Sequence, residues 1–342
     1  MSEKKPNIYD VARLAEVSHQ TVSRVLNNQP NIRPATRARV EAAMATLGYQ
    51  PNPAARSLVT AKSNMLGLLV SDTGLYGPAG MLNAMERSAR QAGYFAITVA
   101  VRFDSPESWA EGLQHLSRMH VEGIATIALQ SEVIKMAAKI MPTIKLIAID
   151  TDDQANKVNA VGIDNLGGGH MATRHLIELG HKKILHIMGP STSSEAQNRR
   201  RGYEQAMAEA GLEPAVVQGD WTAETGFRIG IELNLELTGY TAIFTANDQL
   251  SLGLMKALNM RGVSVPHDIS LVGFDDIPES PYFNPPLTTI RQDFNQLGEV
   301  AIEMLLSDLA GTKRKKFEAL KPNLIVRDSA IRISTSRKSG TA

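Results

Sequence analysis

The sequence predicts a small all-α head followed by a larger α/β body of two doubly wound lobes with parallel sheets. Apolar residues recur at helical spacing in the first fifty positions, as in VSHQTVSRVLN at residues 17–27. After residue 64, short apolar runs of strand length alternate with longer helical patterns, which is typical of parallel sheets covered by helices. The 342 residues are enough for two or three domains with large cores.

Charge is divided unevenly between these two parts. Residues 1–63 hold nine Lys and Arg against four Asp and Glu, a net charge of +5, whereas residues 64–342 hold 27 against 31, a net charge of −4. A basic head is the expected electrostatic footprint of a module that binds a polyanion. A charged face that contacts only water remains the alternative.

Composition excludes several classes of protein. No cysteine is present, so disulfides and thiolate chemistry are excluded. No apolar run approaches the roughly 18 residues of a membrane span, and the N-terminus MSEKKPNIYD has no apolar signal-peptide core. We therefore expect a cytoplasmic protein.

Three helices are predicted in the head. Apolar spacing places them near Ile8–Ala15, Ser18–Asn27 and Pro34–Leu47, with Gly48 as a C-terminal stop for the third. Ser18 is a good N-cap for the second helix. A helix, a short turn and a second helix that begins with polar residues is helix-turn-helix geometry, in which the second helix enters the major groove of DNA.

The polar side chains of the second helix suit base edges and phosphates. Gln20 can pair bidentately with adenine, and Arg24 with guanine. The hydroxyls of Tyr9, Thr21 and Ser23 suit phosphate oxygens. Because helix-turn-helix patterns are short and permissive, an ordinary three-helix bundle with a solvated face stays open on these residues alone.

A Pro- and Asn-rich linker, residues 49–64, follows the head. Within it, Asn52 and Pro53 supply an N-cap and a first helical position for a very short helix that ends at Leu58. Such a helix is not stable alone in water, so it needs a partner. Leu58 offers an apolar side chain that could be inserted at a base step in the minor groove.

Seven apolar runs in the body predict buried strands. Several are apolar on consecutive residues, which is typical of strands buried on both faces. They fall into two groups, before and after about Asn165, and we therefore expect two lobes. The runs are MLGLLV, YFAITVAV, GIATIAL and IKLIAID in the first group and KKILHIM, TAIFTA and ISLVGFD in the second.

Polar side chains stand where predicted strands end. Asp150, Asn247 and Asp275 each follow an apolar run. Ligands of open α/β sheets bind outside the carboxyl ends of strands, so these three should face one crevice. With the guanidinium of Arg199, they would suit vicinal hydroxyls.

Two aromatic side chains, Trp221 and Phe294, could cover the apolar face of a sugar in that crevice. The alternatives are that an Asp at a strand end only caps the next helix, and that a Trp packs in the core. These residues alone do not decide between the two.

Together these stretches resemble the lactose/galactose repressor (LacI/GalR) family of transcriptional regulators. The resemblance is carried by YDVARLAEVSHQTVSRVLN, RPATRARVEAAMATLGYQPNPAARSL, ANDQLSLG, ISLVGFDD and PPLTTIRQDF, and it runs from about Ile8 to about Arg332. It implies a head that binds DNA as a dimer and a hinge helix that pairs with its twin in the minor groove. It also implies that the two lobes form a periplasmic-binding-protein-like body.

The resemblance further implies which residues contact DNA. His19, Gln20 and Arg24 would read bases, although the family varies at position 19, so the base read there does not carry over. Leu58 would be the minor-groove wedge. The DNA-contacting set is Tyr9, Ser18, His19, Gln20, Thr21, Ser23, Arg24, Asn27, Asn52, Ala55 and Leu58.

In this family the positions of Arg199, Asn247 and Asp275 line an effector site. The resemblance is closest to lactose-repressor-type members, whose Leu-x-x-Pro turn, GDW segment and TTIxQDF segment are matched here. One departure is Gly162-Ile163, where such members carry an aromatic residue, so the pocket would be roomier. The effector-contacting set is Leu75, Pro78, Asp150, Arg199, Trp221, Asn247, Asp275, Gln292 and Phe294.

Domain boundaries follow from the patterns and the resemblance. We expect a helix-turn-helix domain at residues 1–49, a hinge helix and linker at 50–63, a two-lobed effector-binding and dimerisation domain at 64–333, and a disordered tail at 334–342. The N-lobe would comprise about 64–162 and 294–321, and the C-lobe about 163–292 and 322–333. The tail, STSRKSGTA, contains no Leu, Ile or Val, so it cannot form a heptad seam that joins dimers.

Motifs for catalysis or metal binding are weak. DNLGGGH at residues 164–170 lacks both the GxGxxG spacing and the GK[ST] ending of phosphate loops, and its glycines are expected to allow close backbone passage between the lobes. The eight histidines show no metal-ligand spacing, and no Ser lies in a nucleophile elbow. The side chains of adjacent Asp275 and Asp276 would diverge, and the basic run KRKK at 313–316 is expected on a solvated turn.

We therefore predict a sequence-specific transcriptional repressor, not an enzyme, with no metal or cofactor. A small sugar between the lobes, for example a galactoside acting as inducer, would control its affinity for a pseudo-palindromic operator. A co-repressor-dependent regulator and a sugar-binding receptor are the alternatives, and the receptor would need a signal peptide and no basic head. A homodimer is expected, with its surface near Met81–Ala92 and the strand near Thr245 on family resemblance.

Overall fold

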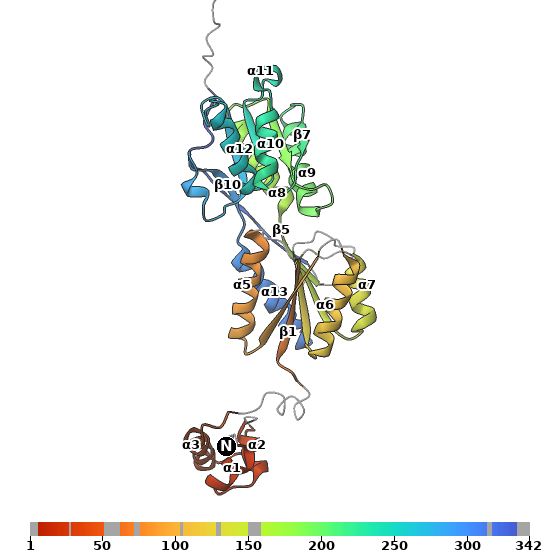
Figure 1. Ribbon diagram of the computed structural model, residues 1–342, viewed down its shortest axis with the longest axis vertical. Helices are drawn as coiled ribbons and strands as arrows, with labels where there is room; N and C mark the ends of the chain where they lie inside the picture. Colours follow the sequence, from red (N-terminus) through yellow and green to blue (C-terminus); the bar gives the residue numbers. More distant parts are fainter. Residues whose placement is uncertain are drawn as a thin grey trace, which may run out of the picture. The chain divides into compact units, whose positions relative to one another are not determined.

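A computed structural model describes residues 6–26, 29–50, 62–71, 76–102, 105–127, 131–149, 159–312 and 317–333. The chain divides into two compact units, Met1–Asn64 and Met65–Ala342, which we call the head and the body (Figure 1). Several predicted features lie outside the described residues. They are the hinge helix with Asn52, Ala55 and Leu58, the side chains of Asn27, Leu75 and Asp150, the KRKK run, and the tail at 334–342.

Three helices make up the described part of the head, as the sequence predicts. They are α1 (Ile8–Leu14), α2 (His19–Leu26) and α3 (Pro34–Leu47). A capping box formed by Asn7 and Asp10 begins α1. Gly48 ends α3 in the left-handed conformation, with φ of 61°.

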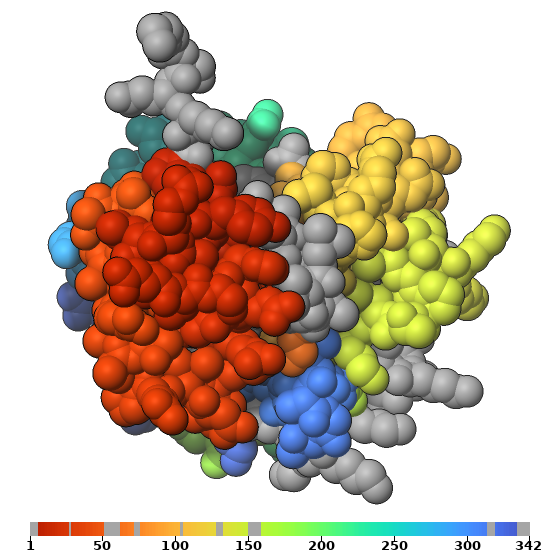
Figure 2. All heavy atoms as spheres, turned by 90° about the horizontal axis from the view of Figure 1, so that it is seen from below, coloured from red at the N-terminus to blue at the C-terminus, as the bar shows by residue number. Residues whose placement is uncertain are grey.

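The head has a small apolar core of its own. Val11 from α1, Val22 from α2 and Val40 from α3 are completely buried and belong to one apolar cluster. The face of the head in Figure 2, drawn in red, is rounded and shows no deep hollow. This shape suits contact with a macromolecular surface better than enclosure of a small molecule.

The first sheet of the body is parallel and forms the lobe that we call the N-lobe. Its strand order among the described residues is β11-β5-β4-β3-β1-β2. The strands are β1 (Met65–Ser71), β2 (Phe95–Val101), β3 (Gly123–Ile127), β4 (Lys145–Ile149), β5 (Asn159–Ile163) and β11 (Phe317–Leu320).

Helices cover both faces of this sheet (Figure 1). The helices α5 (Tyr76–Gln91) and α13 (Phe294–Leu309) bury their apolar side chains against one face. The helices α6 (Pro106–Arg118) and α7 (Ser131–Ile140) cover the other. Burial on both faces explains why the strands are apolar on consecutive residues.

The second sheet forms the C-lobe in the same way, with strand order β12-β10-β9-β8-β6-β7. All described pairings are parallel except that of β12 with β10. The strands are β6 (Ile184–Met188), β7 (Ala215–Gln218), β8 (Ala242–Thr245), β9 (Ser270–Asp275), β10 (Thr288–Arg291) and β12 (Asn323–Ile325).

Helices α8 (Asn165–Glu178) and α9 (Ser194–Glu209) pack on one face of the C-lobe sheet. Helices α10 (Ala223–Glu232) and α12 (Asp248–Met260) pack on the other. Two short elements, α11 (Leu235–Thr238) and the 3-10 helix η1 (Ser280–Tyr282), complete the lobe.

The described chain passes between the lobes three times. The passages join β5 to α8, β10 to α13, and β11 to β12. Two of them touch, because the backbone N–H of Asp164 donates to the carbonyl oxygen of Leu320 at 2.9 Å. Figure 1 shows β5 where the lobes meet. Each lobe is therefore built from separate stretches of sequence.

All seven predicted apolar runs contain a strand. The glycines of DNLGGGH have two kinds of neighbour. Gly169 lies against the backbone of Arg199, and Gly202 against that of Leu166, so these glycines let α8 and α9 pack closely within the C-lobe. Gly168 lies against the ring of Phe274 and against Pro322 on the passage from β11 to β12, so close passage between the lobes holds for this glycine.

The dimer surface near Met81–Ala92 and Thr245 stays a prediction. Met81, Ala84, Met85 and Ala89 on α5 are each at most 1% exposed and pack inside the N-lobe. Thr245 in β8 is completely buried. These five side chains therefore pack within the body, and a partner chain would contact other positions of these elements.

The α8–α9 contact yields a testable prediction. Gly169→Ala should lower the free energy of unfolding by about 3 kcal/mol, because a Cβ there would overlap the backbone of Arg199. Gly80→Ala is a matched control, since it also replaces a helical glycine, but its Cβ would meet the side chain of Phe294 with a nearest distance of 3.4 Å and no backbone atom among those nearest to it. Urea denaturation measures both variants, and equal stabilities would contradict the close packing.

Candidate functional site

One face of α2 presents polar side chains to solvent. Ser18, His19, Gln20 and Arg24 are exposed, whereas Val22 on the opposite side is completely buried. This orientation leaves the amide of Gln20 and the guanidinium of Arg24 accessible to base edges. The other predicted contacts on this helix, Thr21 and Ser23, are half-buried.

Hydroxyl groups fix the start of α2. The backbone N–H of Thr21 donates to Ser18 Oγ at 3.1 Å, which is an N-cap interaction. The side-chain hydroxyls of Ser18 and Thr21 also lie 2.9 Å apart. The N-terminus of the exposed helix is thus held in place before any contact with DNA.

Tyr9 on α1 lies beside this face. Its side chain is 61% exposed, and its ring centroid lies 5.2 Å from that of His19. The two rings join α1 to the start of α2. Tyr9, His19 and Gln20 therefore form one continuous exposed surface, as the predicted DNA contact requires.

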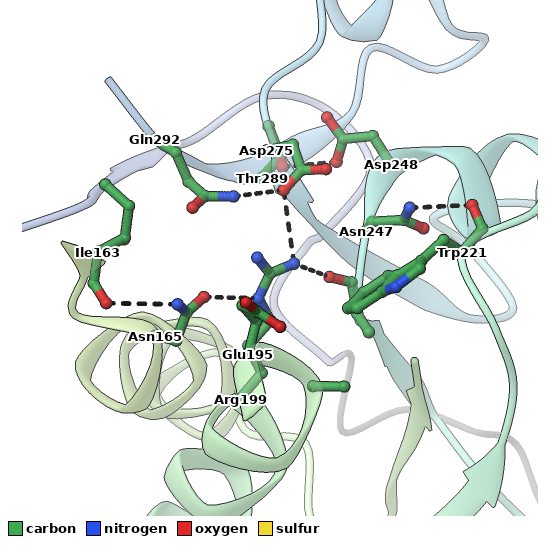
Figure 3. Close-up of polar contacts among 12 residues, drawn as sticks. Ile163, Asn165, Glu195, Arg199, Trp221, Asn247, Asp248, Asp275, Thr289 and Gln292 are labelled. Atoms are coloured by element: carbon green, nitrogen blue, oxygen red, sulfur yellow. Dashed lines mark hydrogen bonds and ion pairs between the residues drawn. The ribbon is translucent and has the colours of Figure 1, made fainter. Parts of the chain in front are cut away.

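A buried polar cluster occupies the carboxyl-terminal edge of the C-lobe sheet (Figure 3). At its centre is Arg199 of α9, which is 4% exposed. Its Nε donates to Asn165 Oδ1 at 2.8 Å, and its Nη1 donates to the carbonyl oxygen of Ala246 at 2.5 Å. The guanidinium also lies over the ring of Phe274, 3.8 Å from its centroid.

Asp275, the last residue of β9, provides the counter-charge. Its Oδ1 lies 3.4 Å from Arg199 Nη1, and it is 9% exposed. Burial raises the pKa of the Asp275 carboxyl to about 6, although the charge of Arg199 opposes this rise. Its φ of 114° is unusual for a residue other than glycine.

Gln292 follows β10 and joins the cluster from one of the passages between the lobes. Its Nε2 donates to Asp275 Oδ1 at 2.5 Å, which fixes the orientation of the amide. The residue is 5% exposed, and its Oε1 has no hydrogen-bond partner among the described residues. A buried acceptor of this kind is a place where a ligand hydroxyl would be stabilised.

Asn247 and Trp221 lie on the other side of Arg199 (Figure 3). Asn247 Oδ1 caps α12 by accepting from the backbone N–H of Leu250 at 2.9 Å. Its Nδ2 donates to the carbonyl oxygen of Trp221 at 3.0 Å. The Trp221 ring centroid lies 5.4 Å from the Arg199 guanidinium. The amide of Asn247 thus supports the Trp221 segment and also caps a helix.

The N-lobe contributes its residues from the starts of α5 and α13. Pro78 is half-buried in the first turn of α5. Phe294 is only 7% exposed and packs edge-on against Tyr76, with 5.7 Å between ring centroids. Phe294 is therefore mainly a core residue, and Tyr76, which packs against it, is half-buried.

Tyr76 was not among the predicted residues, yet it faces the C-lobe. Burial raises the pKa of its hydroxyl, and the negative charges of Asp276, Glu279 and Asp275 raise it further. Those carboxylates belong to the turn after β9, so Tyr76 and this turn lie on opposite sides of the boundary between the lobes. Its position within the predicted Leu-x-x-Pro turn, directly after Leu75, was the available sequence signal.

The adjacent carboxylates Asp275 and Asp276 diverge, as predicted. Asp276 turns away from the cluster and accepts from Arg291 and Arg327, each at 2.6 Å. The predicted reason was an extended segment, but both residues have positive φ, 114° and 56°. No sequence pattern singled out three further residues at this cluster. Two of them contact Arg199, namely Asn165 and Phe274, and the third, Asp248, lies near Asp275.

Within the described residues, no group of three or more His, Cys, Asp or Glu side chains is arranged to hold a metal ion. None of the helices described is both long enough and apolar enough to cross a membrane.

The helix-turn-helix head and the two-lobed body define a class: DNA-binding regulators that carry a periplasmic-binding-protein-like domain. The model for bacterial regulatory proteins of the lacI family matches residues 7–52, and that for the periplasmic binding protein-like domain matches residues 173–330. The chain belongs to the lacI family, as the resemblance indicated. It is a DNA-binding transcriptional repressor and not an enzyme.

Curated relatives and solved structures support this assignment. The lactose operon repressor of Escherichia coli K12 is 33% identical over 99% of this chain and 94% of its own length. The ribose operon repressor of the same strain is 33% identical over 94% of this chain and 98% of its own. A crystal structure of the lac repressor dimer bound to operator and the anti-inducer ONPF matches with a TM-score of 0.87 and 33% identity, over 96% of this chain and all of that one.

The exposed face of α2 yields a prediction for DNA binding. Gln20→Ala and Arg24→Ala should each reduce discrimination between the operator and point-mutated operators by roughly 1–3 kcal/mol. Affinity for random DNA should change much less, because phosphate contacts remain. Gel-shift titrations at fixed salt measure both quantities, and wild-type discrimination in both variants would contradict the base-reading role.

The raised pKa of Asp275 yields a prediction for stability. A carboxyl whose pKa is raised from about 3.9 in the unfolded chain to about 6 in the folded one stabilises the fold fully below pH 4, and this contribution is lost as the pH rises through 6. Asp275→Asn should therefore gain stability relative to the wild type between pH 4.5 and 7.5. Melting temperatures measured across this range test it, and a constant difference between the two proteins would contradict it.

Proposed function

We propose that this repressor binds a pseudo-palindromic operator as a homodimer and releases it when a small neutral sugar binds between the lobes. The sugar acts as an inducer. The observation that carries this proposal is the buried cluster of Arg199, Asp275 and Gln292, in which one acceptor, Gln292 Oε1, has no partner among the described residues.

The charges of the cluster favour a neutral ligand. Arg199 is compensated by Asp275, and its Nε and Nη1 donors are already directed to Asn165 and Ala246. A phosphate or carboxylate would need a cation that lacks a counter-charge. A sugar hydroxyl can donate to Gln292 Oε1, and neighbouring hydroxyls can reach the Asp275 carboxylate.

The apolar part of the site suits the same ligand. The half-buried Trp221 ring offers a flat surface for the C–H face of a sugar. Pro78 and Tyr76 would close the site from the N-lobe. The lactose-type sequence features support a galactoside as the first candidate, and the ribose operon repressor among the relatives makes ribose the second.

Both lobes contribute to the site, so a bound sugar favours one relative arrangement of them. The three passages between the lobes are the places where such a change can occur. The effect on operator affinity equals the difference in the sugar's affinity for the two arrangements. Binding to chromosomal DNA places the protein in the cytoplasm.

Two operator half-sites require two heads, which a two-fold symmetric dimer supplies. The hinge helix of residues 52–58 and the wedge Leu58 remain part of this proposal, as do Asn27 and Ala55.

Light scattering on the full chain should give about twice the chain mass. Deletion of residues 334–342 should leave the dimer intact.

The test combines gel-shift and calorimetry with lactose, isopropyl β-D-thiogalactoside, ribose and cellobiose as probes. One of them should weaken operator binding by the wild type. Arg199→Ala and Asp275→Ala should keep operator affinity but lose about 2 kcal/mol or more of sugar binding, because each removes or releases a charged group that would bond to the sugar hydroxyls.

Arg200→Ala is a matched control for these variants. Arg200 is the next residue of the same helix, but it is exposed and pairs only with Glu204 on the surface. It should behave as the wild type. Tighter operator binding in the presence of a sugar would identify that sugar as a co-repressor. If no probe changes operator affinity and calorimetry detects no binding of any probe, the proposed function is contradicted.

A further inference from the structure

Asp248 is a completely buried carboxylate next to the polar cluster (Figure 3). It is the first residue of α12, directly after the cap residue Asn247. It accepts hydrogen bonds from the backbone N–H of Ile277 at 3.0 Å, from Ser280 Oγ at 2.6 Å and from Thr289 Oγ1 at 2.7 Å. The turn at residues 277–280 and strand β10 therefore meet on this one side chain of α12.

An acidic residue in the first turn of a helix is ordinarily exposed and needs no such partners. Burial of a carboxylate is costly, even where hydrogen bonds compensate for part of the cost. Burial, together with the nearby charge of Asp275, raises the pKa of the Asp248 carboxyl to about 7. Favourable interaction with the helix dipole alone does not account for such a residue in the interior.

The backbone around Asp248 is shaped to receive the carboxylate. Gly273 in β9 lies against Asp248 Oδ1, so that any side chain at this position would overlap the carboxylate. A hydroxyl from β10 and a hydroxyl from η1 converge on the same group. The glycine and both hydroxyls are used for one purpose, which is to hold Asp248 in place.

The segment that Asp248 holds is strained. Asp275 and Asp276 have φ values of 114° and 56°, in a region that residues other than glycine rarely adopt. Each such residue costs on the order of 1–3 kcal/mol, so surrounding contacts must maintain the conformation. Ile277, whose N–H is bound by Asp248, comes immediately after them.

The strained conformation determines where the Asp275 carboxylate points. It directs this group toward Arg199 and Gln292, while Asp276 is held by Arg291 and Arg327 on the other side. Without the contact to Asp248, the Asp275–Ile277 turn would be free to relax to a more common conformation. Asp275 would then lose its alignment with the cluster.

We propose that Asp248 is a positioning residue of the effector site: it holds the Asp275–Ile277 turn so that the Asp275 carboxylate meets the ligand. This inference rests on the proposed function for the role of the ligand. The contact between Asp248 and the turn, and its effect on the cluster, can be tested without any ligand.

Trp221 provides the signal for that test. Its carbonyl oxygen is bound by Asn247 and its ring lies near Arg199, so its environment reports on the cluster. The other tryptophan, Trp109, is 1% exposed in the N-lobe core and serves as the internal reference. Incorporation of 5-fluorotryptophan into the full chain gives two ¹⁹F resonances, which Trp109→Phe assigns.

Asp248→Asn keeps the shape of the side chain but removes its charge and one of its acceptors. The Trp221 resonance should shift, while the Trp109 resonance should stay in place. In the wild type, two coupled buried carboxyls should make the Trp221 resonance titrate in two steps between about pH 5 and 8. The variant should show a single step, at lower pH than the upper step of the wild type, because one of two like charges is gone.

Thr289→Val and Ser280→Ala are matched variants that keep the Asp248 charge and each remove one donor to it. They should shift the Trp221 resonance less than Asp248→Asn does, and both titration steps should remain. If Asp248→Asn does not fold, these two variants carry the test. A Trp221 resonance with wild-type position and titration in every folded variant would overturn the proposal, even if melting temperatures fall.

Sugar binding provides the second measurement. The sugar that binds the wild type should bind Asp248→Asn about tenfold more weakly. A loss of this size is expected when the residue that supports a ligand-contacting group is removed. Operator affinity without sugar should stay within about twofold. Unchanged sugar affinity in Asp248→Asn would overturn the positioning role. If no probe binds the wild type, the proposed function fails, and the ¹⁹F titration still decides the role of Asp248.

Discussion

The buried guanidinium of Arg199 is the constraint on which the C-lobe depends. A charge that is 4% exposed requires a counter-charge and acceptors, and it receives them from Asp275, Asn165 and Ala246. These partners lie on β9, at the start of α8 and after β8, so a single side chain fixes three elements around the strand ends. For Arg199 to reach them, α9 must approach α8 closely, and the glycines Gly169 and Gly202 allow this.

The same edge of the sheet is where the chain changes lobes. Gln292 lies on the passage from β10 to α13, and Asn165 directly follows the passage from β5 to α8. Residues that bind Arg199 and Asp275 are therefore also the residues next to the connections between lobes. In the proposed mechanism, a sugar that bonds to Gln292 acts directly on one of these connections, which gives binding a physical route to lobe arrangement.

Residues of the site could be predicted from the sequence where a known motif places a functional side chain at a defined position. Asp275 came from its place at a strand end, Arg199 from the chemistry of its guanidinium, and both also from resemblance to the lacI family, whereas Gln292 came from the resemblance alone. The structure brings all three together, although their contact with an effector remains a proposal. Asp248 was missed because an acidic residue at a helix start is ordinary in any sequence. The contact of Gly169 with Arg199 and the burial of the apolar face of α5 were not foreseen, since a pattern shows that a residue packs closely but not which surface it meets.

The sequence by itself determined the local elements: the three head helices, with Ser18 and Gly48 at helix ends, and the positions of the seven strands, of which the edge strand β2 is largely not buried. Periodicity and caps act within a few residues, so they can be read along the chain. Only the tertiary structure decided that Asp248 is buried, that Asp275 and Asp276 take positive φ, and that Gln292 keeps an acceptor without a partner among the described residues. These properties depend on contacts between segments far apart in sequence, and no local pattern encodes them.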